Sequence, residues 1–224
     1  STTLAIPYQL WRDLFAHRFE ILESDSGAQA LDRFRAGMAE VLGPERADLV
    51  GQLVGFDFAG AGSEAVQALM GSPNFGHLAR AYLVQYVRGM VARQPMVMLL
   101  EDLQWADDSS LDLVAQLVSE MSEAPLLVVG AARPRLFERR PSWGEGQRSY
   151  KILRLEPVSK RASRRLVEEI LQKAVEVPQE LRELIVESAE GNPYYVEELI
   201  KMLVEDGVIV RGEPHWEVEA ERLA

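Results

Sequence analysis

The stretch that decides the fold is PMVMLLEDLQWADDSS, residues 95–110. It begins with an apolar run from Met96 to Leu100 and ends abruptly in two adjacent carboxylates, Glu101 and Asp102. An apolar run without alternating polar residues is typical of a parallel strand, so we expect helices to cover both of its faces. The pattern predicts a buried strand whose carboxyl end carries an acidic pair.

A second strand is predicted one helix later. Residues 126–132, LLVVGAA, are also fully apolar and end at Arg133. Between the two runs, an apolar stripe predicts an amphipathic helix, with Asp108 as its expected N-cap. Two strands joined by one helix form a right-handed βαβ unit, so Glu101, Asp102 and Arg133 should lie along one edge of a sheet. We expect a third strand at residues 150–155.

The rest of the chain is predicted to be mainly helical, which gives an α/β fold in three parts. These are a helical segment at 1–90, an α/β core at 91–157 and a helical lid at 158–224. A β-hairpin is expected over 207–218, turning at Gly212. The glycine-rich segment 55–62 lacks a Lys-Ser/Thr pair, so we interpret it as an ordinary loop. Helices are expected at 28–42, 77–91, 159–172, 178–189 and 194–205.

Composition excludes several classes of function. The net charge of −11 argues against general affinity for nucleic acid or anionic lipid. The absence of cysteine removes thiol nucleophiles and cysteine-bound zinc, and the three histidines lie too far apart for a metal-binding pair. No apolar run approaches the roughly 20 residues that span a bilayer, and no secretory signal is apparent, so a cytoplasmic location is expected.

The acidic pair and the arginine resemble half of a nucleoside triphosphatase site. Of Glu101 and Asp102, one could hold Mg²⁺ and the other could orient water, while Arg133 could sense a γ-phosphate. Gln104 could help to orient the nucleophile, and Trp105 is expected to pack beneath the loop. Alternatively, the two carboxylates only cap a helix or face solvent, and Arg133 belongs to a solvated surface. Helix capping is the better interpretation of residues 107 and 108.

Four segments in order carry a resemblance to a known family. They are EDLQWADDSSLDLV, GAARPRLFERRP, LRLEPVSKRASRRLVEEIL and AEGNPYYVEELIKMLVEDGVI. Together they resemble the signal-transduction ATPases with numerous domains. These are AAA/P-loop ATPase modules of large bacterial adenylate or guanylate cyclases and of regulators of the maltose-activator type. The first segment is similar to the Walker B strand of these modules and the second to their sensor-arginine strand. The resemblance covers roughly residues 80–210.

The resemblance implies an incomplete P-loop sheet flanked by helices and followed by a helical lid that ends in a winged-helix-like hairpin. It implies a regulatory module that uses ATP and Mg²⁺, binds ATP or ADP, and contacts other domains of the same polypeptide. Gly191, Asn192 and Pro193 match the turn through which the family's lid approaches the nucleotide. An exposed edge of the sheet would also allow pairing into a homodimer.

Two departures from the family pattern matter. Gln104 stands where the family usually has histidine, and no GxxxxGK[ST] phosphate loop occurs in the 224 residues. In the family that loop lies upstream of the point at which this chain begins. We therefore expect a distal portion of a longer protein that binds ATP weakly or not at all by itself, because the loop supplies most of the triphosphate contacts.

Two other functions are open. Helices followed by a hairpin over residues 180–218 would suit a winged-helix nucleic-acid binder. However, residues 176–224 hold 13 acidic and 4 basic side chains, the wrong sign for a phosphate backbone. The third possibility is a scaffold that retains the fold for protein contacts and binds no nucleotide.

Overall fold

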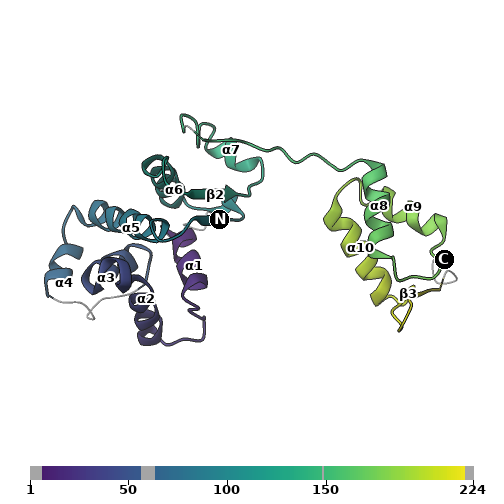
Figure 1. Ribbon diagram of the computed structural model, residues 1–224, viewed down its shortest axis with the longest axis horizontal. Helices are drawn as coiled ribbons and strands as arrows, with labels where there is room; N and C mark the ends of the chain where they lie inside the picture. The colour runs from purple at the N-terminus through teal and green to yellow at the C-terminus, as the bar shows by residue number, and fades with distance from the viewer. Residues whose placement is uncertain (1–6, 57–63, 148, 220–224) are drawn as a thin grey trace, which may run out of the picture. The chain divides into compact units, whose positions relative to one another are not determined.

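The computed structural model describes residues 7–56, 64–147 and 149–219. Most of the predicted glycine-rich loop at 55–62 therefore lies outside the described residues. The chain divides into two compact units, Ser1–Lys151 and Ile152–Ala224 (Figure 1). Each unit is described by itself.

The larger unit opens with helices whose ends follow from local sequence. Ser26 caps α2 by accepting a hydrogen bond from the Gln29 N–H, and the Gln29 side chain accepts one from the Ser26 N–H in return. Pro44 stands at the first position of α3, where its missing N–H costs nothing. The helices are α1 (Gln9–Arg18), α2 (Gly27–Leu42), α3 (Pro44–Leu53), α4 (Glu64–Met70) and α5 (Phe75–Val91).

The two predicted strands are present and adjacent. Strand β1 (Met96–Leu100) pairs in parallel with β2 (Leu126–Gly130), and Leu100 stands opposite Gly130. The connection between them contains a short 3-10 helix, η1 (Leu103–Trp105), and α6 (Asp108–Glu120); α7 (Arg135–Arg139) follows β2. The fold is thus mixed α/β and mostly helical, with a small parallel sheet.

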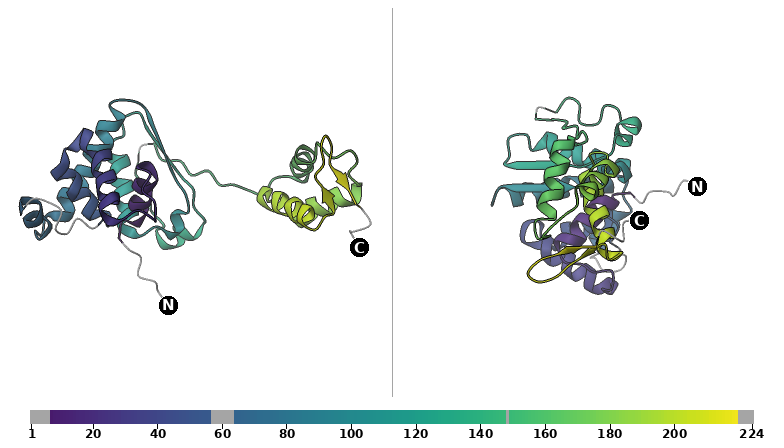
Figure 2. Two further views of the ribbon diagram at one scale, coloured as in Figure 1. Left: turned by 90° about the horizontal axis from the view of Figure 1, so that it is seen from below. Right: turned by 90° about the vertical axis from the view of Figure 1, so that its right-hand side faces the viewer.

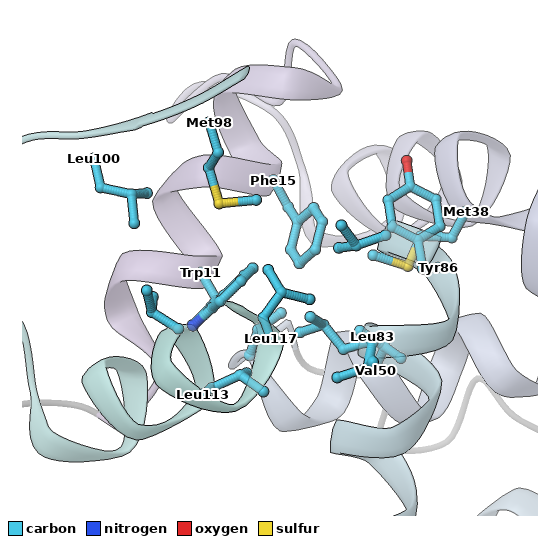
Figure 3. Close-up of a cluster of buried hydrophobic side chains, with 14 of the residues drawn as sticks. Trp11, Phe15, Met38, Val50, Leu83, Tyr86, Met98, Leu100, Leu113 and Leu117 are labelled. Carbon is cyan, nitrogen blue, oxygen red and sulfur yellow. The ribbon is translucent and has the colours of Figure 1, made fainter. Parts of the chain in front are cut away.

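One face of this sheet packs on the helices. Met98 and Leu100 of β1 point toward Trp11 and Phe15 of α1, as Figure 3 shows. Both strand residues are buried in the main core, which also takes side chains from α2, α3, α5 and α6. The sheet edge that carries the acidic pair is therefore anchored by residues from across the whole larger unit.

The expectation that both faces of the strands are covered is wrong for the described residues. Val97 is 68% exposed and Leu99 is 61% exposed, and Leu127 and Val129 on β2 are exposed beside them. Successive side chains in a strand point to opposite faces, so these four form the face that the described helices leave open. The apolar run predicted burial on both faces of the strand. Burial of the second face requires helices from other segments, and none of the described helices packs on it.

Two further expectations need correction. Residues 150–155 form no strand; Leu155 in this segment is 94% exposed. Apolar composition favours an extended backbone, but a strand also needs a pairing partner, and the described part of the sheet contains β1 and β2 alone. The N-cap of α6 is Asp107 and not Asp108, because the Asp107 side chain accepts the Ser110 N–H.

The smaller unit is a three-helix cluster with a hairpin (Figure 2). Ser159 caps α8 (Lys160–Ile170) as predicted, and α9 (Gln179–Ser188) and α10 (Pro193–Glu205) follow. The predicted hairpin is present: β3 (Ile209–Val210) pairs antiparallel with β4 (Glu217–Val218). The buried core of the smaller unit consists of aliphatic side chains. Within the described residues, no helix is both long and apolar enough to cross a membrane.

Candidate functional site at the strand tips

The carboxyl ends of β1 and β2 are joined by main-chain hydrogen bonds beyond the strands themselves. The Ala131 N–H donates to the Leu100 carbonyl at 2.8 Å, and the Leu103 N–H donates to the Ala131 carbonyl at 3.1 Å. Between these two bonds, Asp102 takes the left-handed conformation, with φ of 53°. Strand β1 ends before this turn and η1 begins after it. The acidic pair therefore lies just beyond the carboxyl end of β1 and not within the sheet.

The Gln104 side chain connects the two tips. Its amide nitrogen donates to Asp102 Oδ1 at 2.7 Å, and its amide oxygen accepts the Arg133 N–H at 2.9 Å. Gln104 is only 4% exposed. Sequence reasoning placed Gln104 near this site but missed this bridge; the available signal was an amide residue two positions after an acid at a strand end.

The charged groups at this edge are open to solvent. Glu101, Asp102 and Arg133 are all exposed, and they follow strands that are direct neighbours. Within the described part of the chain, the Arg133 guanidinium makes no ion pair, so it is available to an anion. The structure thus brings together the acidic pair, Gln104 and the Arg133 backbone at one edge.

The segment after Arg133 is held against α6. Arg140 contacts Asp112 at 2.5 Å and Asp108 at 3.2 Å, and its hydrogen bond to Asp112 raises the pKa of the guanidinium. The indole N–H of Trp143 donates to the Leu111 carbonyl at 3.1 Å. These contacts fix the loop that leaves β2 and so limit where Arg133 can move.

Asp107 organises the other side of the same loop. Its carboxylate accepts hydrogen bonds from the Ser110 N–H and hydroxyl, and also from the N–H groups of Tyr8 and Gln9 at 3.1 and 3.2 Å. One buried carboxylate therefore caps α6 and also binds the backbone at the start of α1. Helix capping was predicted for this residue, but the contact with α1 was not.

Trp105 does not pack beneath the loop as expected. It is 63% exposed, and the Arg135 guanidinium lies 5.3 Å from the centre of its ring. The tight turn at Asp102 directs the buried positions of η1 to Leu103 and Gln104, which leaves the indole outside.

Gly191, Asn192 and Pro193 belong to the smaller unit, where they form the turn before α10. Gly191 has φ of 79°, and its carbonyl accepts the Val158 N–H at 2.8 Å. A Cβ at this position would lie 2.7 Å from the Val158 carbonyl oxygen, so the turn requires glycine. The Asn192 side chain caps α10 by accepting the Tyr194 N–H.

The acidic pair has the donor chemistry for Mg²⁺ held jointly with phosphate. Among the described residues, no group of three or more His, Cys, Asp or Glu side chains could hold a metal ion. Mg²⁺ commonly uses one or two carboxylates, with phosphate oxygens and waters completing its shell. Two exposed carboxylates at a strand tip fit that requirement, but they do not form a complete metal cage.

The parallel strand pair carries acids after one strand and an arginine after the next, at the carboxyl ends of the strands, which is where open α/β sheets generally bind ligands. A family model described as AAA ATPase domain matches residues 1–129, more than half of the chain. The chain belongs to the AAA ATPase domain family, and this membership supports a module of the AAA/P-loop ATPase kind. No curated protein and no solved structure matches it.

Proposed function

We propose that the chain supplies the acidic and sensor portion of the nucleotide site in a regulatory ATPase module of a multidomain bacterial signalling protein. The observation that carries the proposal is the parallel pairing of β1 and β2, because Glu101 and Asp102 directly follow β1 and Arg133 comes three residues after the end of β2. Membership of the AAA ATPase domain family supports the use of ATP and Mg²⁺ in general. Association with an adenylate or guanylate cyclase is part of the proposal and rests on the resemblance of the four sequence segments. A cytoplasmic location is also part of the proposal and rests on the sequence expectation given above.

Each group at the edge has a distinct role in this proposal. Glu101 and Asp102 bind or orient the hydrated cation and the attacking water, and the Arg133 guanidinium contacts the terminal phosphate. Mg²⁺, when bound, would offset the negative charge of the phosphate oxygens. Gln104 holds Asp102 and the Arg133 backbone in register, in addition to any contact with water.

We propose the three sequence parts as functional parts of the module: helices at 1–90, the α/β core at 91–157 and a lid at 158–224. In this scheme Gly191, Asn192 and Pro193 approach the nucleotide, and the β3–β4 hairpin is winged-helix-like. The support for the lid is the resemblance of the GNP turn together with the glycine-specific geometry at position 191. Homodimer formation through strand pairing is also part of the proposal. Its support is that the outer side of β1 and the outer side of β2 pair with no other described strand.

The test compares the chain alone with a protein in which a GxxxxGK[ST]-bearing strand and helix precede residue 1. The chain alone should bind Mg²⁺-ATP only with a dissociation constant on the order of 1 mM or weaker, because it lacks the phosphate loop. The loop-bearing protein should bind at least about tenfold more tightly and hydrolyse ATP. The matched control replaces the loop lysine with alanine and should return binding to the weak level.

A measurement on the unmodified chain keeps this test independent of the added loop. Inorganic tripolyphosphate should shift the amide resonances of Asp102 and Arg133 more than those of the smaller unit's helices. Absence of such shifts, together with no ATP binding in a folded loop-bearing protein, would overturn the proposal.

One observation favours a second candidate, a scaffold that binds no nucleotide. The 224 residues contain no GxxxxGK[ST] segment, and a scaffold would not need one. A scaffold would bind no ATP even when the phosphate loop is added. The same ATP titration therefore separates the scaffold from the ATPase module. A winged-helix nucleic-acid binder is disfavoured by the acidic excess over residues 176–224.

A further inference from the structure

The smaller unit contains a cavity of about 340 Å³ at the start of α8 and the end of α9. Val158 and Val186 form its aliphatic wall, and its charged groups come from Lys160, Glu187 and Glu190. This volume is at the lower end of the range that is typical of small-molecule sites, which usually combine apolar walls with a few polar groups. The cavity is therefore large enough to take a small ligand.

Ser163 also lines this cavity, and its hydroxyl is an unusual feature of the unit. The residue is only 1% exposed, and its Oγ is the one fully buried side-chain polar atom among the described residues that has no hydrogen-bond partner. Burying a hydroxyl without a partner is unfavourable, and folded proteins rarely retain such a group without a reason. The Ser163 hydroxyl is therefore available to a ligand in the cavity.

Several backbone donors near the cavity are already engaged, which argues against an anionic ligand. The Ala162 N–H donates to the Ser159 hydroxyl, and the Ser163 N–H donates to the Ser159 carbonyl. The Val158 N–H donates to the Gly191 carbonyl at 2.8 Å. Anion sites at the start of a helix depend on free N–H groups, so these three donors are not available to a phosphate or a carboxylate.

The charged side chains around the cavity favour a cation. Glu187 and Glu190 carry two negative charges against the single positive charge of Lys160. The Lys160 ammonium lies 3.6 Å from Glu187 Oε1, and the two side chains are 70% and 66% exposed. An exposed ion pair of this kind is weak, so an incoming ammonium can compete with Lys160. The end of α9 adds to the attraction, because the C-terminus of a helix favours positive charge.

We propose that this cavity is a binding site for an alkylammonium group, the chemistry that free polyamines and lysine side chains share. The ammonium binds Glu187 and Glu190 in place of Lys160. It also donates a hydrogen bond to the Ser163 hydroxyl, while its alkyl chain packs against the aliphatic wall. The site lies within the smaller unit and does not involve the strand tips, so the inference goes beyond the proposed ATPase function.

The test titrates the full 224-residue chain with n-butylammonium and follows the backbone amides by ¹⁵N NMR. The salt concentration is about 0.15 M, which screens non-specific attraction to the acidic surface. Resonances of residues 158–163 and 186–191 should shift with a dissociation constant on the order of 1 mM, as expected for so small a ligand. The neutral analogue n-butanol should bind at least about tenfold more weakly, because it carries no charge.

Two charge variants have predicted effects of opposite sign. Lys160→Ala removes the competing ammonium and should tighten n-butylammonium binding about threefold. Glu190→Gln removes a negative charge and should weaken binding about threefold. The matched control is Glu180→Gln, an exposed position on α9 that does not line the cavity, and it should leave binding unchanged.

Ser163→Ala tests the buried hydroxyl in two ways. The variant should bind n-butylammonium about tenfold more weakly, because the ammonium loses an acceptor. Without ligand, the smaller unit should unfold with an unchanged or higher free energy, since the hydroxyl makes no hydrogen bond that could be lost. A clear loss of stability in the ligand-free variant would show that the hydroxyl has a partner, and it would overturn the proposal.

Two further ligands distinguish the sources of the ammonium group. Tighter binding of spermidine would assign the site to free polyamines, and tighter binding of Nα-acetyl-lysine amide would assign it to a lysine side chain of a protein. Equal shifts with n-butanol, or weaker binding of n-butylammonium by Lys160→Ala, would overturn the proposal. Shifts with adenosine monophosphate but none with n-butylammonium would also overturn it.

Discussion

The two units are stabilised by contacts of very different range along the chain. In the larger unit, Asp107 binds the backbone of residues 98 and 99 positions away, and Phe15 packs edge-on against Phe34 and Tyr86. In the smaller unit, neighbouring helices share an aliphatic core, and Ser159 and Asn192 cap the helices that follow them. The strand-tip site therefore depends on contacts between residues nearly 100 positions apart, whereas the reported contacts of the smaller unit span much shorter stretches of the chain.

We therefore predict that a destabilising substitution in the core of one unit lowers the free energy of unfolding of that unit and leaves that of the other unit unchanged. Hydrogen exchange measured on peptides from each unit reports the two free energies of unfolding separately. The following substitutions run from the largest expected effect to the smallest.

Phe34→Ala should have the largest effect. Phe34 is fully buried on α2 and contacts Phe15, Phe19 and Phe56, with ring centroids 5.7, 5.6 and 4.8 Å apart. Truncation leaves a cavity among aromatic rings, so the larger unit should lose about 4 kcal/mol of unfolding free energy. The smaller unit should be unaffected. Leu22→Ala, at an exposed position, is the control, and an equal loss there would contradict the assignment.

Asp107→Ala should come next. The side chain is 8% exposed and accepts four hydrogen bonds, two of them from the start of α1. The larger unit should lose about 3 kcal/mol, through the lost cap and the unpaired N–H groups.

The neighbouring Asp108 provides the matched control for this substitution. It is more exposed and pairs with Arg140 at 3.2 Å, so Asp108→Ala should cost less than about 1 kcal/mol. Equal losses at the two positions would contradict the role of Asp107 in capping α6 and in binding the backbone at the start of α1.

Ser159→Ala tests the smaller unit. The Ser159 hydroxyl accepts the Ala162 N–H at 3.2 Å, and its loss should cost this unit about 1 kcal/mol. Ser159→Asp keeps an acceptor at the cap and should restore most of that stability. A comparable loss in the larger unit would contradict the separation of the two cores.

The smallest effect should be a dependence of the smaller unit on acid. Arg164 contacts Glu183 through two hydrogen bonds of 2.9 Å, which lower the pKa of Glu183 from its ordinary value of 4.5. A lowered folded-state pKa gives stability that is present above pH 4.5 and is lost as pH falls through the folded value. Glu183→Gln should reduce this dependence in melting curves recorded across that range, and an unchanged pH profile would remove the pair from the account.

The sequence was sufficient to predict what depends on local pattern. The apolar runs at 96–100 and 126–132, with one helix between them, correctly predicted adjacent parallel strands, and Ser159 was correctly identified as a helix cap. In both cases the deciding interactions lie within one supersecondary unit, where periodicity and capping chemistry are informative.

Long-range contacts could not be predicted in the same way. Nothing near Asp107 indicates that its carboxylate meets Tyr8 and Gln9, because that contact depends on how α1 docks. The exposed face at Val97 and Leu99 and the absent strand at 150–155 share one cause. Apolar composition shows that a segment is able to form a strand or to be buried. It does not show whether another segment of the chain pairs with that strand or covers its face.

The central claim is that the tips of β1 and β2 form the acidic and sensor side of an ATP site. Its most direct test measures ATP affinity and turnover for Asp102→Asn in a protein that carries a phosphate loop ahead of residue 1. We predict that turnover falls on the order of 100-fold while the dissociation constant for ATP changes by less than about threefold. Unchanged turnover in the variant, or no turnover in the folded parent protein, would contradict the claim.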